Sequence, residues 1–366
     1  MAEKDLGYRR VQCTGRGSYI ISLPKDWIQN VGLKRGNEID FIVQPDLSLT
    51  LIPRKIKEKY KGDEQTKLRE YYISVDTAEE KESTLRMIKA LYVISADIIH
   101  VHFKGENVDK FKDVIKNFAR DTLLGAEIID EKTDEITLQI LIKHSEFPIE
   151  NAVRRMAVVA LSANRDSILA LKNRSKELFQ SVINAHHDTN RLGLYAVRQL
   201  KFGIERNLFR ELGFKTPKEF LLYRIIVNDI KSISENALNV INSLATLQKQ
   251  IDEQLLFIKD PIDEEVYSQL LTFNSHAQQL FEDSLKAMFK KDYFDAEKII
   301  TKRENFTQLE NELIKLMASK KLDPNIATIL RLMLDNSRRL MDHAQDIAEL
   351  TLNRTVEEIC TTLEVK

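Results

Sequence analysis

The feature that most constrains the fold is an internal repeat in the second half of the chain. Residues 107 positions apart correspond, as Arg224 and Arg331 do. Two apolar seams repeat with steps that alternate between four and three residues: Ile226, Ile230, Ile233, Ala237, Val240 and Leu244 in one copy, and Met333, Ser337, Leu340, Ala344, Ile347 and Thr351 in the other. Such spacing is typical of helices that pack side by side. The repeat therefore predicts two three-helix bundles, over 147–251 and 261–356.

Prolines mark the starts of the helices expected in this half of the chain. Proline suits the first turn of a helix because its missing N–H would be unpaired there anyway. The predicted starts lie at Pro148, Pro217, Pro261 and Pro324, and the second and fourth are again 107 residues apart. Elsewhere turn residues are scarce: 11 glycines and 7 prolines are about 3% and 2% of 366 residues, against about 7% and 5% in average usage. A multi-domain, mostly helical chain is expected.

Composition sets several classes aside. The 55 basic and 56 acidic residues nearly cancel, so net charge does not indicate a partner. Two cysteines, Cys13 and Cys360, cannot make a disulfide framework or a four-cysteine zinc site, and this usage fits a reducing cytoplasm. The first ten residues have no apolar signal region, and no apolar run approaches the roughly 18 residues of a transmembrane helix. We expect a cytoplasmic protein without a transmembrane segment.

The N-terminal residues 1–56 are predicted to form a small β-rich domain. Short β-type runs occupy 8–13, 18–23, 38–44 and 47–53, and residues 24–32 could form a helix of one or two turns. A piece of this size buries little apolar surface alone. Assembly of two chains would solve that problem.

A charged stretch, residues 55–67, follows without an apolar period and is expected to be a linker or an exposed helix. Residues 68–145 then alternate in character. Strand-like runs lie at 69–75, 96–103, 125–131 and 135–142, with helical runs at 79–95 and 108–123. The order β-α-β-α-β-β predicts a small α/β sheet domain.

An excess of positive charge lies in the N-terminal part of the chain. Residues 1–60 hold 11 basic and 7 acidic side chains, whereas acids outnumber bases in the rest. Guanidinium and ammonium groups suit phosphate, so this excess favours an anionic partner. The candidate DNA-binding residues are Arg9, Arg10, Arg16, Lys25, Lys34 and Arg35. A merely solvated charged surface is the alternative.

Residues 15–36 resemble the AbrB/SpoVT family of DNA-binding domains. The matching features are Gly-x-Gly-Ser at 15–18, Ile-Ser-Leu-Pro at 21–24, Trp27, and the glycine-bounded loop 32–36. The resemblance implies a homodimer in which two chains interleave hairpins into one swapped-hairpin β-barrel. It also implies that arginines and lysines on the exposed face contact DNA, with Arg10 and Arg16 the best matches. Some members of the family instead bind proteins as antitoxins, so that reading stays open.

Residues 338–350, RRLMDHAQDIAEL, resemble the third-helix motif of PhoU proteins, and residues 232–242 are a weaker copy. Tandem three-helix bundles are the PhoU architecture, so motif and repeat agree. Together with the N-terminal domain, the chain looks like an archaeal phosphate-uptake regulator. The resemblance implies promoter DNA and the ATPase of a phosphate ABC transporter, or another regulatory protein, as partners.

PhoU bundles often bind divalent metals through Glu/Asp-x-x-x-Asp, in which two carboxylates one turn apart reach one cation. Here Lys231 and Arg338 stand where the first acid would be. The candidate ligands that remain are Glu235, Asp335, Asp342 and Asp346. No cofactor is required on this reading, and a solvated or salt-bridged face is the alternative to a metal.

Two function classes follow. The first is a non-enzymatic, DNA-binding transcriptional regulator of phosphate uptake whose helical body senses or relays transport status. The second is an adaptor that docks on the transporter and uses the N-terminal barrel only to dimerise. An enzyme in 68–145 has little support, since no acid, base and nucleophile cluster there. His100 and His102 are interpreted as surface or cross-strand packing residues.

Overall fold

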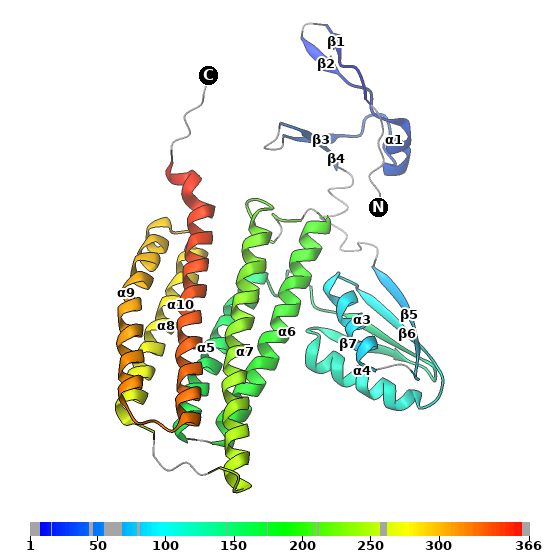
Figure 1. Ribbon diagram of the computed structural model, residues 1–366. Helices are drawn as coiled ribbons and strands as arrows, with labels where there is room; N and C mark the ends of the chain where they lie inside the picture. Colours follow the sequence, from blue (N-terminus) through cyan, green and yellow to red (C-terminus); the bar gives the residue numbers. More distant parts are fainter. Residues whose placement is uncertain are drawn as a thin grey trace. The chain divides into compact units, whose positions relative to one another are not determined.

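The computed structural model describes residues 8–15, 17–43, 47–54, 68–78, 81–143, 145–173, 175–206, 208–210, 212–256 and 262–360. Contacts divide the chain into unit 1, residues 1–68, and unit 2, residues 69–366 (Figure 1). The chain is multi-domain and mostly helical, as the sequence predicts. The finer division predicted inside unit 2 stays a prediction. Among the described residues, no helix has the length and apolar character to cross a membrane.

Unit 1 contains two antiparallel hairpins on either side of a short helix. Strand β1 (Gln12–Thr14) pairs with β2 (Ser18–Ile20), and β3 (Ile39–Val43) pairs with β4 (Leu49–Pro53). Helix α1 (Lys25–Val31) ends at Gly32, whose φ of 66° lies in the left-handed region that favours glycine. The expected turn at Pro45-Asp46 lies outside the described residues.

Each hairpin of unit 1 presents an apolar face that no described residue of unit 1 buries. In the second hairpin Phe41 pairs with Leu51 and Val43 with Leu49. The residues Phe41 and Val43 are 64% and 65% exposed. In the first hairpin Tyr19, opposite Cys13, is 76% exposed. Among its described residues, unit 1 therefore has no apolar core of its own, and a barrel built from two chains remains a prediction.

Unit 2 begins with a four-stranded sheet in the order β5-β6-β8-β7. The elements are β5 (Glu70–Asp76), α3 (Lys81–Val93), β6 (Ile98–Lys104), α4 (Val108–Thr122), β7 (Ala126–Glu131) and β8 (Glu135–Ile140). Strands β5 and β6 are parallel, and β8 is antiparallel to both β6 and β7. The predicted β-α-β-α-β-β order is confirmed. Apolar side chains of the sheet and of α3 and α4 form one core.

The rest of unit 2 consists of long helices. They are α5 (Ile149–Asn173), α6 (Lys176–Arg206), α7 (Glu219–Asp252), α8 (Glu264–Lys290), α9 (Tyr293–Ser319) and α10 (Pro324–Ile359). Helix α10 begins with Pro324, and the Asp323 carboxylate accepts from the Asn325 and Ile326 N–H groups. Helix α8 is capped by Asp263 instead of starting at the expected Pro261, which lies outside the described residues.

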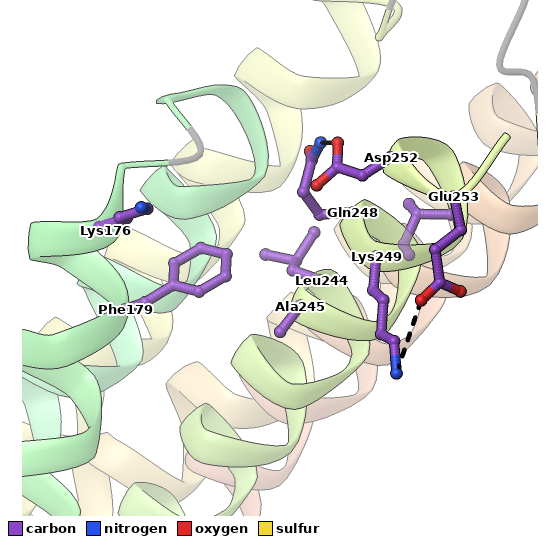
Figure 2. A pocket seen from close by; sticks show the side chains of 9 residues that line it. Lys176, Phe179, Leu244, Ala245, Gln248, Lys249, Asp252 and Glu253 are labelled. Carbon is purple, nitrogen blue, oxygen red and sulfur yellow. Dashed lines mark hydrogen bonds and ion pairs between the residues drawn. The ribbon is translucent and has the colours of Figure 1, made fainter.

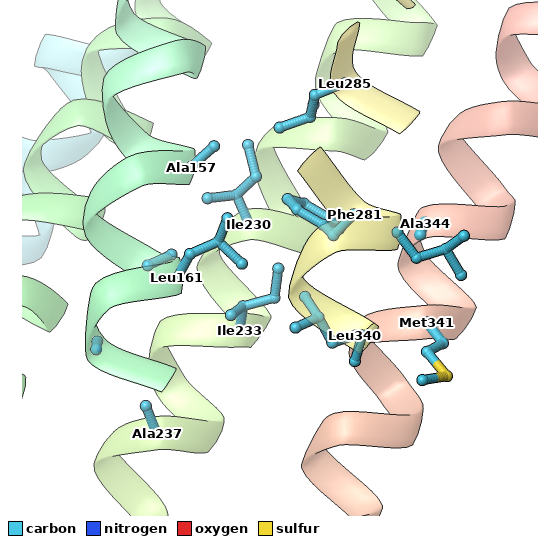
Figure 3. Close-up of a cluster of buried hydrophobic side chains, with 14 of the residues drawn as sticks. Ala157, Leu161, Ile230, Ile233, Ala237, Phe281, Leu285, Leu340, Met341 and Ala344 are labelled. Atoms are coloured by element: carbon cyan, nitrogen blue, oxygen red, sulfur yellow. The ribbon is translucent and has the colours of Figure 1, made fainter. Parts of the chain in front are cut away.

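The repeated apolar seams form the centre of the helical body. All twelve seam residues are buried, none with more than 3% of its surface exposed. Figure 3 shows Ile230 and Ile233 of α7 in the same apolar cluster as Phe281 of α8 and Leu340 of α10. The four-three spacing thus identified the packed faces of both third helices.

Helices α7 and α10 run antiparallel and are related by a local pseudo-twofold axis. Asp229 lies beside His343, and the Asn336 side-chain amide donates to the Asn236 carbonyl over 3.0 Å. Asp229 and Asn336 are 107 residues apart, as are Asn236 and His343. The two contacts are therefore equivalent positions of the repeat.

Helix α6 joins the sheet domain to the helical body. Leu194 of α6 packs into the core of the sheet domain. Arg198, 8% exposed, donates to the carbonyl oxygens of Tyr92 and Ala96 over 2.8 and 2.6 Å. The Ser95 hydroxyl in turn donates to the Arg198 carbonyl over 3.1 Å. These bonds fix the C-terminal end of α3 against α6, so the sheet and the bundles form one unit.

Candidate functional site

The predicted basic residues of unit 1 lie on exposed segments around the first hairpin and α1. Arg9 and Arg10 precede β1, Lys25 begins α1, and Lys34 and Arg35 lie in the loop before β3. All five are exposed within the described chain. Arg16 lies outside the described residues.

These five cations are electrostatically available. None of them forms an ion pair with another described residue, and Arg9 donates only to the neighbouring Tyr8 carbonyl, over 2.9 Å. Arg54 is different: its guanidinium binds Asp40 at 2.8 Å and Glu38 at 2.6 Å. Hydrogen bonds to Asp40 and Glu38 raise the pKa of Arg54. Arg54 is therefore neutralised, whereas the five cations without an ion pair among the described residues are suited to binding a polyanion.

The acids of the second repeat that the PhoU resemblance points to are largely neutralised by arginines. The Asp342 carboxylate accepts from Arg303 Nε and Nη2 at 3.1 and 2.7 Å, and its second oxygen lies 3.5 Å from Arg338. Asp335 lies 3.4 Å from Arg331. A cation would have to displace these guanidinium groups. The residues present therefore do not fit a metal bound in the Glu/Asp-x-x-x-Asp manner.

The corresponding position in the first repeat is also unsuited to a cation. Glu235 is exposed, and Lys231 precedes it by one helical turn. Burial lowers the pKa of Lys231, and the charges of Lys89 and Arg224 lower it further, whereas Glu235 raises it. Burial also lowers the pKa of the nearby His186. The described groups around Glu235 are mainly basic, so Glu235 has no second carboxylate beside it among them with which to bind a cation.

Asp346 is the one predicted ligand that the structure places in a potential metal-binding group. Its carboxylate and the side chains of Asp229 and His343 offer ligand atoms that all lie within 4.8 Å of one another. The sequence did not single out Asp229 or His343, because they belong to different repeats. They meet only through the antiparallel packing of α7 and α10.

A groove at one end of the first bundle lies between α6 and α7 (Figure 2). Its floor includes Phe179 and Leu244, and its rim carries Lys176, Gln248, Lys249, Asp252 and Glu253. The rim groups mostly satisfy one another, since Gln248 donates to Asp252 over 2.8 Å and Lys249 lies 3.8 Å from Glu253. The described residues that line the groove do not combine a nucleophile with an oriented base.

The sheet face opposite α3 and α4 carries the two strand histidines. The His100 ring stacks on Tyr72 with ring centroids 4.3 Å apart, and its Nδ1 lies 3.1 Å from Thr137 Oγ1 on the neighbouring strand. His102 Nδ1 lies 3.6 Å from Asp134. The prediction of surface and cross-strand packing roles is confirmed for both.

Comparisons with known families find one match in unit 1 and one in the helical body of unit 2. Residues 12–59 match the family described as antidote-toxin recognition MazE, bacterial antitoxin, and these residues include both hairpins of unit 1. Residues 270–351 match the PhoU domain, which spans most of α8, α9 and α10. No curated protein matches the chain at a significant level. The chain thus combines a MazE/AbrB-like N-terminal domain with a PhoU domain, as the resemblances implied.

Proposed function

We propose that this combination makes the chain a DNA-binding transcriptional regulator of phosphate uptake. The observation that carries the proposal is the coincidence of the MazE/AbrB-like match with five exposed cations in unit 1 that form no ion pair with another described residue. Phosphate contacts supply most of the sequence-independent affinity of DNA-binding proteins. The helical body, which contains the PhoU domain, is the regulatory part. It receives information about phosphate transport from a partner protein and changes the DNA affinity of unit 1.

The proposed active form is a cytoplasmic homodimer without catalytic activity. Its two hairpin pairs interleave, so that the apolar faces around Phe41 and Tyr19 cover one another. The exposure of those faces in one chain supports this assembly, since apolar surface of this extent is unfavourable in water. Dimerisation also doubles the number of cations along the DNA backbone, because Arg9, Arg10 and their neighbours occur in each copy.

The test is binding of the purified full-length protein to promoter fragments of phosphate-transport genes, compared with random DNA of equal length. We expect preferential binding to the promoter fragments that is weakened in the double variant Arg9→Ala/Arg10→Ala. Arg120→Ala is the matched control, because Arg120 is an exposed arginine of α4 whose side chain bonds Asn117 and Asp121 in unit 2. Equal binding of promoter and random DNA, or equal loss in the control, would contradict the proposal.

A second candidate function rests on the description of the matched family as an antitoxin and on the apolar faces of unit 1. In it, unit 1 only dimerises or binds a protein, and the PhoU domain docks on a phosphate transporter. This candidate predicts no DNA binding and co-purification with the transporter ATPase. Retained ATPase binding in Arg9→Ala/Arg10→Ala, together with absent DNA binding by the wild type, would favour it.

A further inference from the structure

A cluster with unsatisfied buried polar atoms lies in the helical body where the two repeats meet. Asp229 of α7 faces His343 of α10, with Asp229 Oδ1 3.2 Å from His343 Nδ1. The Asp229 and His343 side chains are only 13% and 19% exposed. Despite this proximity, the buried atoms Asp229 Oδ2 and His343 Nδ1 have no hydrogen-bond partner among the residues that the structure describes. Buried polar atoms without partners are unfavourable.

The charges around this cluster make the lack of partners more costly. The ligand atoms of Asp229, His343 and Asp346 lie within 4.8 Å of one another, so two carboxylates face one imidazole. Asp342 already forms ion pairs with Arg303 and Arg338. The acids of the cluster therefore face each other with a single imidazole for compensation.

The equivalent position across the pseudo-twofold axis is built differently. There the counterparts of Asp229 and His343 are Asn336 and Asn236, which are neutral, and the Asn336 side-chain amide donates to the backbone carbonyl of Asn236 over 3.0 Å. The counterpart of Asp346 is Asn239. One side of the same interface is thus uncharged, and the other is acidic and holds the unpaired buried atoms Asp229 Oδ2 and His343 Nδ1. Packing of α7 on α10 alone does not require the acidic arrangement.

We propose that Asp229, His343 and Asp346 bind a divalent transition-metal ion of the zinc, manganese or iron(II) class, which links the two repeats. Carboxylate and imidazole ligands bind these ions at about 2.0–2.2 Å, which places two ligand atoms of one tetrahedral ion about 3.3 Å apart. The 3.2 Å between Asp229 and His343 fits that separation. His343 and Asp346, three residues apart on α10, share a helix face.

The cluster also offers a path for the ion. Asp346 is exposed, whereas Asp229 and His343 are partly buried behind it. An ion can therefore enter from solvent at Asp346 and complete its coordination with water. The site is distinct from the Glu/Asp-x-x-x-Asp position, where Arg303 and Arg338 surround Asp342.

The test uses full-length protein stripped with a chelator, and titrations of Zn²⁺, Mn²⁺ and Co²⁺ followed by calorimetry, with Mg²⁺ as the comparison ion. We expect about one transition-metal ion per chain at this site and weaker binding of Mg²⁺, which prefers all-oxygen ligands. At a metal concentration a hundredfold above Kd, the melting temperature should rise by about 5 °C. Bound Co²⁺ should show visible absorption that reports nitrogen ligation.

Two isosteric variants, Asp229→Asn and Asp346→Asn, should each lower the metal affinity at least tenfold and abolish the thermal shift. The metal-free Asp229→Asn protein should be at least as stable as the metal-free wild type, because the change removes acid–acid repulsion. Asp335→Asn, on the same helix but paired with Arg331, is the matched control and should bind like the wild type. Unchanged affinity in both cluster variants, equal loss in the control, or no transition-metal binding by the wild type would overturn the proposal. A second result would also overturn it: the metal-free Asp229→Asn protein is less stable than the metal-free wild type, and its melting temperature does not change with metal. Asp229 would then be a simple ion-pair partner of His343.

Discussion

The substitution Phe41→Thr should weaken the proposed dimer through the apolar face of the second hairpin. Phe41 lies at the centre of β3, and the residue is 64% exposed in the single chain. Threonine keeps the preference for extended backbone, so the hairpin itself should persist. The change therefore removes apolar surface without removing the strand.

The expected magnitude follows from the exposed area. An aromatic side chain buries about 150–250 Å², so the exposed part of Phe41 is roughly 130 Å². At about 25 cal/mol per Å², covering it contributes about 3 kcal/mol, of which threonine would retain about 1 kcal/mol. Two copies per dimer then lose about 4 kcal/mol, which is roughly a thousandfold in the dimer Kd.

Sedimentation equilibrium of the full-length protein over a concentration series measures that Kd. Phe294→Thr is the matched control, because Phe294 of α9 is 65% exposed and carries the same side chain outside unit 1. We expect a large shift towards monomer for Phe41→Thr and little change for Phe294→Thr. A dimer Kd that changes less than tenfold, or equally in the two variants, would refute the reasoning that unit 1 is completed by a second chain.

Two further predictions concern unit 2. Arg198→Ala removes the donors to the Tyr92 and Ala96 carbonyls and leaves these buried groups unpaired. The free energy of unfolding, measured in urea, should therefore fall by about 3–5 kcal/mol. A decrease below about 1 kcal/mol would contradict the role of α6 in joining the sheet to the helical body. Burial lowers the pKa of His186, and the charge of His187 lowers it further. As the pH falls below the ordinary pKa of histidine, the unfolded chain therefore binds a proton at His186 before the folded protein does. The wild type should therefore lose stability in that pH window, and His186→Gln should lose less of it; parallel stability curves between pH 7 and pH 5 for the two proteins would show that this burial is unimportant.

Features set by local periodicity were predictable from the sequence. The seam residues from Ile226 to Thr351 follow a helical spacing that is visible without any partner, and they all proved buried. The order of strands and helices along residues 68–145 followed in the same way from alternating short runs. The glycine at position 32 likewise marked the end of α1, because it adopts a left-handed conformation there.

Features set by long-range pairing were not predictable. Asp342 was a candidate ligand until Arg303, 39 residues earlier in the chain, proved to bind its carboxylate. Asp229 gave no signal, because its meeting with His343 requires both the repeat and the antiparallel direction of α7 and α10. The role of Arg198 was also missed, since an arginine in a polar-looking helix gives no sign that it donates to the end of α3.

The central claim is that unit 1 binds DNA through its exposed cations, and the salt dependence of binding tests it most directly. The logarithm of the binding constant should fall linearly with the logarithm of salt concentration, with a slope of about −0.9 for each phosphate contact. Arg9→Ala/Arg10→Ala removes four cations from a dimer, so we predict that the slope becomes shallower by about 3.6 if each cation contacts one phosphate. Binding that is independent of salt, or a slope identical in the wild type and the double variant, would contradict the claim.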